Sequence, residues 1–193
     1  LRRRGPLDRN HFGWIWQTDH DGIGKSAELV NPAQSNNNGQ NWAASTPAGG
    51  TPGASNSAFA SDIAPIVSDV EHSPAIPRST DFVTIRAEVD DEVAAGLTVE
   101  VLHRSSDFDS FTATTMFDDG QHDDGAADDG IYAVVLPPQS HGTVVEFYVR
   151  ATDATEHTRT WPAATDDVGT QGANALYQID NGYYAGEAPL YRL

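Results

Sequence analysis

Cysteine is absent from this 193-residue chain, and lysine occurs once, at Lys25. Without cysteine the protein can form no disulfide, no thiolate metal site and no thiol nucleophile, although secretion stays compatible with the sequence. Lys and Arg together number only 11 against 28 Asp and Glu, which gives a net charge of −17. Nucleic acids and anionic lipids are bound through basic surfaces, so this balance argues against both as partners. A saline habitat would explain the acidity equally well.

Long apolar runs are also missing. No stretch reaches the ~20 apolar residues that a transmembrane helix needs, and no signal peptide with an apolar core is present. The sequence therefore predicts no membrane span, and if the protein is exported we expect its signal to lie upstream of Leu1. A composition of 38% hydrophobic and 20% charged residues is nevertheless that of a chain that can bury a core.

Residues 63–161 have the pattern of short β-strands at regular spacing. Apolar and polar residues alternate along several segments, and Pro, Asp and Gly mark turns between them. We predict strands at residues 64–70, 82–89, 97–103, 111–117, 131–136, 143–151 and 158–161. Seven short strands within roughly 100 residues are typical of an immunoglobulin-like β-sandwich, an all-β fold. No helix of useful length is expected.

The alternation also predicts which side chains form the core, because successive residues of a strand face opposite sides of the sheet. Every second residue of the predicted strands at 82–89 and 143–151 is apolar, and we expect these residues to face inward: Val83, Ile85, Ala87, Val89, Val145, Phe147, Val149 and Ala151. We expect the centre of the core to contain Ile85, Val101, Val135, Phe147 and Val149.

The flanking sequence divides the chain into three parts. Residues 1–60 contain apolar runs at 12–17 and 27–30 and then a stretch rich in Asn, Gly and Ser, which predicts a β-hairpin, an irregular segment and a linker. Residues 61–163 form the predicted sandwich. Residues 164–193 are polar with four tyrosines, and we predict an extended C-terminal arm that leads to a further domain.

The first part resembles a known family. Residues 21–32 (DGIGKSAELVNP), 41–45 (NWAAS) and 49–53 (GGTPG) resemble the C-terminal half of a bacterial lamin-tail domain, with Ala27 where the family usually has Leu. The N-terminal strands of that family have no counterpart in the sequence, so the resemblance implies a hairpin with an unpaired edge. Unpaired edges invite association. We therefore expect the hairpin to dock on the sandwich or to pair with a second copy as a homodimer.

The middle part resembles the immunoglobulin-like module that follows lamin-tail domains in large secreted bacterial proteins, through residues 116–120 (MFDDG), 128–132 (DDGIY) and 145–153 (VEFYVRATD). Residues 188–193 (APLYRL) resemble the opening strand of a CotH-type kinase domain, whose nucleotide and Mg²⁺ ligands would lie beyond Leu193. These resemblances imply a secreted or cell-surface protein whose partners are neighbouring domains of the same chain. They assign no catalytic residue here.

The strongest chemical signal is the triplet Asp-Asp-Gly, which occurs three times at intervals of five residues, at 118–120, 123–125 and 128–130. Six carboxylates in so short a loop repel one another unless they spread into water or share a cation, and oxygen ligands on a glycine-hinged backbone suit Ca²⁺. The spacing fits neither an EF-hand nor a calcium β-roll. Two interpretations remain, an irregular Ca²⁺ site or a solvated loop whose aspartates form Asx-turns. The candidate ligands are Asp118, Asp119, Asp123, Asp124, Asp128 and Asp129.

Aromatic and catalytic patterns are weaker. Trp14, Trp16 and Trp42 are candidate ligand-binding residues that could stack on a polysaccharide, with core positions as the alternative. The chain lacks Gly-x-Ser-x-Gly, and with 28 acids some carboxylate pair falls at a hydrolytic separation by chance. The sequence thus favours a non-catalytic accessory or adhesion module. The alternatives are a hydrolase that acts on glycan or ester bonds through acidic residues and a carbohydrate-binding module.

Overall fold

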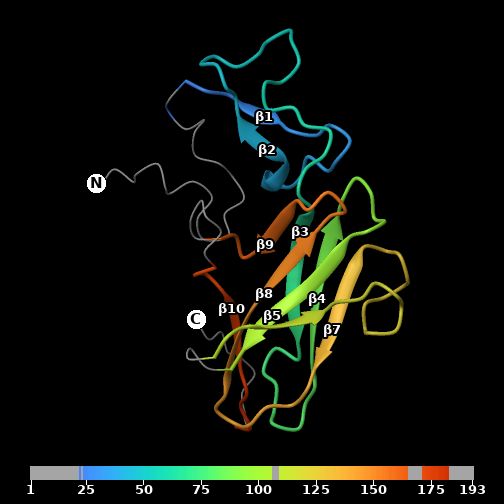
Figure 1. The fold of residues 1–193 in the computed structure, drawn as a ribbon. Coiled ribbons are helices and arrows are strands. Elements are labelled where there is room, and N and C mark those ends of the chain that lie inside the picture. Colours follow the sequence, from blue (N-terminus) through green and yellow to red (C-terminus); the bar gives the residue numbers. More distant parts are fainter. Residues whose placement is uncertain (1–21, 23, 106–108, 165–170, 183–193) are drawn as a thin grey trace, which may run out of the picture.

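The structure is a computed structural model that describes residues 22, 24–105, 109–164 and 171–182. Strands dominate this part of the chain, and one 3₁₀ turn interrupts them (Figure 1). The elements are β1 (Ala27–Leu29), η2 (Gly39–Asn41), β2 (Trp42–Ala44), β3 (Ile66–Ser73), β4 (Val83–Asp90), β5 (Thr98–Arg104), β6 (Thr112–Thr115), β7 (Ile131–Leu136), β8 (Val144–Thr152), β9 (Thr158–Trp161) and β10 (Ala175–Gln178).

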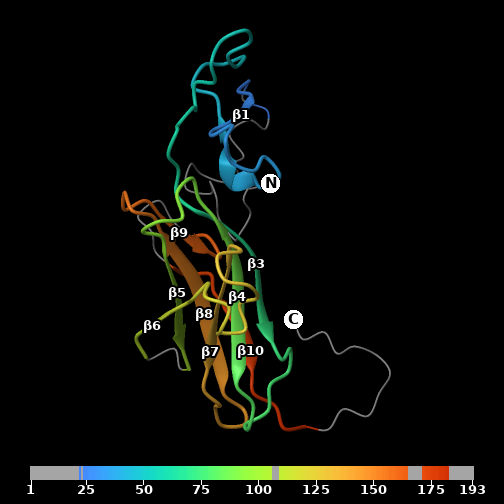
Figure 2. The same cartoon turned by 90° about the vertical axis from the view of Figure 1, so that its right-hand side faces the viewer.

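Two antiparallel sheets form a sandwich from β3 to β10 (Figures 1 and 2). One sheet has the order β3-β4-β7. The other has the order β10-β8-β5-β6, and β9 pairs with the part of β8 that β10 leaves uncovered. The fold is therefore the all-β, immunoglobulin-like sandwich that the strand spacing predicts.

The core lies between the two sheets and is built mainly from aliphatic side chains. All eight positions that the alternation in β4 and β8 turns inward are buried, and Val101 is buried as well. Val135 is the exception, because its side chain is 37% exposed whereas Val134 and Leu136 are buried. It pairs with Thr84 on the outer face of the sheet. Its prediction as a core residue was wrong.

Strand positions agree closely with the sequence pattern. β7 and β9 have the predicted bounds, and the other five predicted strands are shifted at one or both ends. β10 was not predicted. It lies within the segment predicted as a C-terminal arm, pairs with the first half of β8, and buries Tyr177 and the following Ile179. Part of that segment thus completes the sandwich.

Residues 24–60, called here the N-terminal segment, fold around polar rather than apolar groups. β1 pairs with β2, whereas residues 12–17 of the predicted hairpin lie outside the described residues. Asn31 and Asn41 are buried and bond each other, since the Asn31 N–H donates to Asn41 Oδ1 and Asn41 Nδ2 donates to the Asn31 carbonyl, both at 2.8 Å. Such paired amides satisfy groups that would be costly to bury alone.

The N-terminal segment contacts the end of the sandwich where β3 begins (Figure 1). The Gln40 side chain bonds the Val67 backbone in both directions, donating at 2.8 Å and accepting at 3.0 Å. From β9, Arg159 donates to the Gln40 carbonyl at 3.4 Å, and also to the Pro65 and Ala64 carbonyls of the connection at 2.7 and 3.1 Å. Residues 24–60 therefore dock on the sandwich through polar contacts. The docking that we expected was that of the hairpin at residues 12–30, which these contacts do not involve, so it stays a prediction.

Candidate functional site

The repeated Asp-Asp-Gly triplets form a loop, residues 118–130, between β6 and β7; it is called here the Asp/Gly loop. Its backbone requires glycine. Gly125 has a φ of 109°, and a Cβ there would lie 2.8 Å from Asp129 Oδ2. Asp123 and Asp128 also adopt positive φ, at 62° and 60°. Aspartate tolerates this left-handed conformation better than most side chains.

Asp124 is the internal anchor of the loop and is fully buried. Its carboxylate accepts the backbone N–H groups of Asp119, Gly120 (2.8 Å) and His122 (3.1 Å). Burial acts to raise the pKa of Asp124, but these donors outweigh that effect and hold the pKa below its ordinary value. Asp124 is therefore a carboxylate whose oxygens are occupied by the loop's own backbone.

Asp118 and Asp129 close the loop. Asp118 accepts the backbone N–H groups of Asp129 at 3.1 Å and Gly130 at 3.0 Å. Asp129 in turn accepts those of Ala126 at 2.9 Å and Ile131 at 3.0 Å. The contact from Ile131, two residues after Asp129, is of the Asx-turn type that is the alternative to metal binding, whereas the Asp118 contacts join the two ends of the loop. They hold the three triplets in one compact shape.

Four of the six predicted ligands line a single hollow. Its volume is about 750 Å³, and it opens beside the loop at the ends of β4 and β5. The acidic residues that line it are Asp90, Asp91, Glu100, Asp118, Asp119, Asp128 and Asp129. Asp123 faces elsewhere and accepts the Thr84 hydroxyl at 3.2 Å. The loop therefore divides into a lining group of aspartates, the buried Asp124, and Asp123 on another surface.

Among the described residues, the lining of the hollow contains seven Asp and Glu side chains and no Lys or Arg. Tyr132 lies in it, and burial first, then the charges of Asp118, Asp128 and Asp91, raise the pKa of its phenol. The same concentration of charge favours a cation. Since a hard cation such as Ca²⁺ prefers carboxylate oxygens, the chemistry of the lining matches the predicted ligand type.

The tryptophans give a weaker site. Trp42 is half-buried on β2, and its indole Nε1 donates to the Asn36 carbonyl at 3.0 Å. Trp14 and Trp16 lie outside the described residues. Polysaccharide binding by these three residues stays a prediction, as does hydrolysis through a pair of acidic residues.

A second polar cluster was not predicted from the sequence. In the described part of the chain, Asp62, Asp153 and His157 are the group of metal-ligating side chains whose ligand atoms all lie within 4.8 Å of one another. Asp153 and His157 flank one turn, but Asp62 lies in the connection before β3. No local motif joins the three residues, because the fold itself brings Asp62 to this turn.

The strand order and the core together define an immunoglobulin-like domain. Residues 90–160, from the end of β4 into β9, match the family described as the conditioned medium factor 2nd Ig-like domain. The match covers well under half of the chain and includes the Asp/Gly loop. No curated protein matches the sequence. The match supports the immunoglobulin-like module, while the lamin-tail and kinase resemblances stay predictions.

Proposed function

We propose that the protein is a non-catalytic accessory or adhesion module of a larger secreted or cell-surface protein, and that its Asp/Gly loop binds Ca²⁺. The immunoglobulin-like fold supports a module of this general kind. No helix of the described residues is long and apolar enough to cross a membrane. Neighbouring domains of the same chain, of lamin-tail and kinase type, would be the partners. Because fold alone does not determine function, the Ca²⁺ part rests on the loop itself.

The observation that carries the Ca²⁺ proposal is that Asp118, Asp119, Asp128 and Asp129 line one hollow. Each carboxylate oxygen has two lone pairs, so an oxygen that accepts a backbone N–H can also contact a cation. The internal hydrogen bonds of the loop fix its shape before binding, which lowers the entropy that an ion must remove. Occupation by Ca²⁺ would then neutralise part of the repulsion among these charges.

Thermal unfolding in chelator and in excess Ca²⁺, at constant ionic strength, tests the proposal. Ca²⁺ that binds only the folded state should stabilise it by roughly 2.7 kcal/mol at a hundredfold excess over its dissociation constant. We expect a higher melting temperature in Ca²⁺ than in chelator. Mg²⁺ should replace it poorly, because Mg²⁺ requires octahedral geometry and loses its water reluctantly.

The loop supplies a matched pair of variants for this test. Asp128 lines the hollow and Asp123 does not, yet both are the first residue of a triplet and both have positive φ. Asp128→Asn should reduce the Ca²⁺ response, and Asp123→Asn should preserve it. Equal melting temperatures with and without Ca²⁺ in the unaltered protein, or an equal loss in the two variants, would contradict a site in the hollow.

A further inference from the structure

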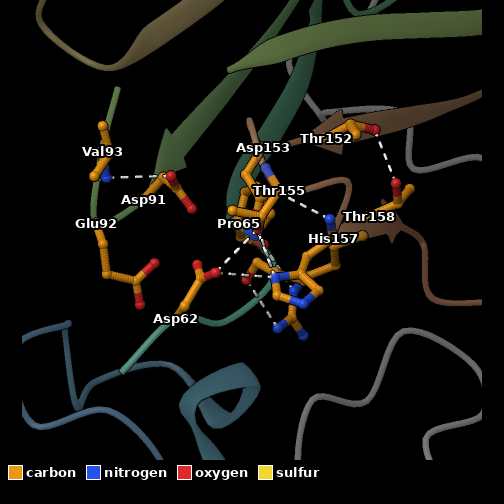
Figure 3. A network of polar contacts seen from close by, with 12 residues as sticks. Asp62, Pro65, Asp91, Glu92, Val93, Thr152, Asp153, Thr155, His157 and Thr158 are labelled. Atoms are coloured by element: carbon orange, nitrogen blue, oxygen red, sulfur yellow. Dashed lines mark hydrogen bonds and ion pairs between the residues drawn. The ribbon is translucent and has the colours of Figure 1, made fainter. Parts of the chain in front are cut away.

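A mixed cluster of two carboxylates and an imidazole lies where the N-terminal segment meets the sandwich. Asp62 belongs to the connection that leads into β3, and Asp153 and His157 belong to the turn between β8 and β9. Figure 3 shows the side chains of Asp62 and His157 directed toward one another, with Asp153 and Thr155 beside them. The cluster is separate from the hollow beside the Asp/Gly loop.

The spacing of the cluster is that of ligands around a single ion. His157 Nδ1 lies 3.2 Å from Asp153 Oδ2 and 3.5 Å from Asp62 Oδ2. Metal–ligand bonds of about 2.0–2.1 Å at tetrahedral angles place neighbouring ligand atoms about 3.3 Å apart. The imidazole nitrogen and the two carboxylate oxygens can therefore contact one ion without a large movement.

Asp153 provides an independent sign that a cation belongs here. The residue is only 6% exposed. Its Oδ1 accepts the backbone N–H groups of Thr155 at 2.8 Å and His157 at 2.9 Å. Its buried Oδ2 accepts no hydrogen bond and faces His157 Nδ1 at 3.2 Å, which is a counter-charge only when the imidazole is protonated. A buried carboxylate oxygen without a donor is costly, and a bound cation would compensate it.

When His157 Nδ1 carries no hydrogen and is free to bind a metal, the Thr155 hydroxyl is the hydrogen donor at the centre of the cluster. Thr155 Oγ1 lies 3.0 Å from Asp62 Oδ2, 2.9 Å from Asp153 Oδ1 and 3.0 Å from His157 Nδ1. A hydroxyl has a single hydrogen and can donate it to one of these three atoms. In that tautomer of His157, the cluster has more acceptor atoms than hydrogens to donate.

The surroundings add further negative charge. Asp91 Oδ1 and Glu92 Oε2 are also buried without a hydrogen-bond partner. Burial first, and then the charges of Glu92, Asp153 and Asp62, raise the pKa of Asp91. Arg159, the arginine of this junction, directs its guanidinium to backbone carbonyls rather than to these carboxylates.

We propose that Asp62, Asp153 and His157 form a site for a divalent transition-metal ion of the Zn²⁺ class. One imidazole with two carboxylates suits an ion of intermediate softness, whereas Ca²⁺ takes six to eight oxygens. Asp62 comes from the connection and the other two ligands come from the sandwich. The ion would therefore tie the connection that follows the N-terminal segment to the turn between β8 and β9. This site does not depend on Ca²⁺ binding by the Asp/Gly loop.

Calorimetric titration of Zn²⁺ into the full chain, with Ca²⁺ present in excess, tests the site. We expect a specific Zn²⁺ site whose affinity falls at least about tenfold in Asp62→Ala, Asp153→Asn and His157→Gln. The Asn at position 153 keeps an Oδ1 acceptor for the turn. His122→Gln is the matched control, since His122 Nδ1 lies 2.9 Å from Asp119 Oδ1 in the Asp/Gly loop. It should bind Zn²⁺ as the unaltered protein does.

Hydrogen exchange gives a second readout. Zn²⁺ should slow exchange in residues 60–65 of the unaltered protein but not of Asp62→Ala, a variant at an exposed side chain that should fold normally. The proposal is overturned if Zn²⁺ does not bind, if it binds Asp62→Ala, Asp153→Asn and His157→Gln undiminished, or if His122→Gln loses affinity as they do.

Discussion

Three buried carboxylates, Glu28, Asp124 and Asp153, differ in how their oxygens are used. Both oxygens of Glu28 accept hydrogen bonds, and so do both oxygens of Asp124. Asp153 has one oxygen in hydrogen bonds, while the other accepts none and lies 3.2 Å from His157 Nδ1. Burial alone therefore does not identify a functional acid. Among these three residues, the oxygen without a hydrogen bond makes Asp153 the candidate ligand.

Glu28 should make the N-terminal segment sensitive to acid. The hydrogen bond from the Thr51 hydroxyl lowers the pKa of Glu28 most, and burial acts in the opposite direction. Hydrogen bonds from the Ser57 hydroxyl and from backbone N–H groups lower the pKa further, so it lies below its ordinary value. A carboxyl group whose folded pKa is depressed stabilises the fold above its unfolded pKa, about 4.3, and that contribution disappears as the pH falls through the folded pKa. Glu28→Gln removes this contribution.

We expect Glu28→Gln to be less stable than the unaltered protein at pH 7 and the difference to shrink in acid. The indole N–H resonance of Trp42, on β2 within the same segment, can follow its unfolding by NMR at each pH. Comparison of the two proteins cancels the acid sensitivity of the other carboxylates. A difference that stays constant from pH 7 to pH 3 would mean that the Glu28 charge is not the cause.

At the scale of elements, the sequence predicts what is local and periodic. β4 and β8 alternate cleanly, so both the strand and its inward face can be read from the pattern. β7 is apolar throughout, from Ile131 to Leu136, and for that reason alternation could not determine its phase and Val135 was misassigned. β10 has only four residues, which is too short for a periodic signal, and it forms because β8 has an edge free to pair with it.

The same distinction applies to the sites. The Asp/Gly loop is contiguous in sequence, so its location and acidic character were predictable. The different contacts of its six aspartates were not predictable, because they depend on which backbone N–H groups each carboxylate reaches in the folded loop. The cluster of Asp62, Asp153 and His157 depends on contacts between distant parts of the chain. A single sequence contains no local pattern for such a contact.

The core assignment can be tested with two truncations. Phe147 on β8 is 3% exposed, whereas Val135 on β7 is on the outer face. Phe147→Ala should lower the free energy of unfolding by about 3–5 kcal/mol, because it leaves a cavity among packed side chains. Val135→Ala should change it by no more than about 0.5 kcal/mol. Chemical denaturation measures both, and similar losses in the two variants would contradict the assigned phase of β7.

At the scale of the whole molecule, polar contacts hold the N-terminal segment on the sandwich. The Gln40 side chain forms two hydrogen bonds with the Val67 backbone, as a residue of a neighbouring strand would. Arg159 donates a hydrogen bond to the Pro65 carbonyl in the connection. Contacts of this kind between units resemble transient interfaces more than a shared core. The orientation of the segment should therefore respond to single substitutions that leave the sandwich intact.

Gln40→Ala should loosen this junction. Each hydrogen bond contributes about 0.5–1.5 kcal/mol, so the loss of two should speed hydrogen exchange at the Val67 amide several-fold or more. The Ile85 amide, in the centre of β4, is the internal control and should exchange at an unchanged rate. Faster exchange at both amides would indicate that the substitution destabilises the whole sandwich, and no change at Val67 would show that Gln40 does not secure the junction.

The chain leaves the sandwich at opposite ends, and this has a mechanical consequence. The N-terminal segment adjoins the start of β3, whereas residues after β10 adjoin the far end of β3, where the Asp180 N–H donates to the Pro77 carbonyl at 2.8 Å (Figure 1). A force applied between domains on either side of this one would act along the strands. It would load the hydrogen bonds of β3 to β4 and of β10 to β8 in shear, so that many bonds carry the force together. Bonds loaded together resist force better than bonds opened one after another. As a spacer under tension, the domain should therefore yield slowly, at a rate set by its unfolding barrier.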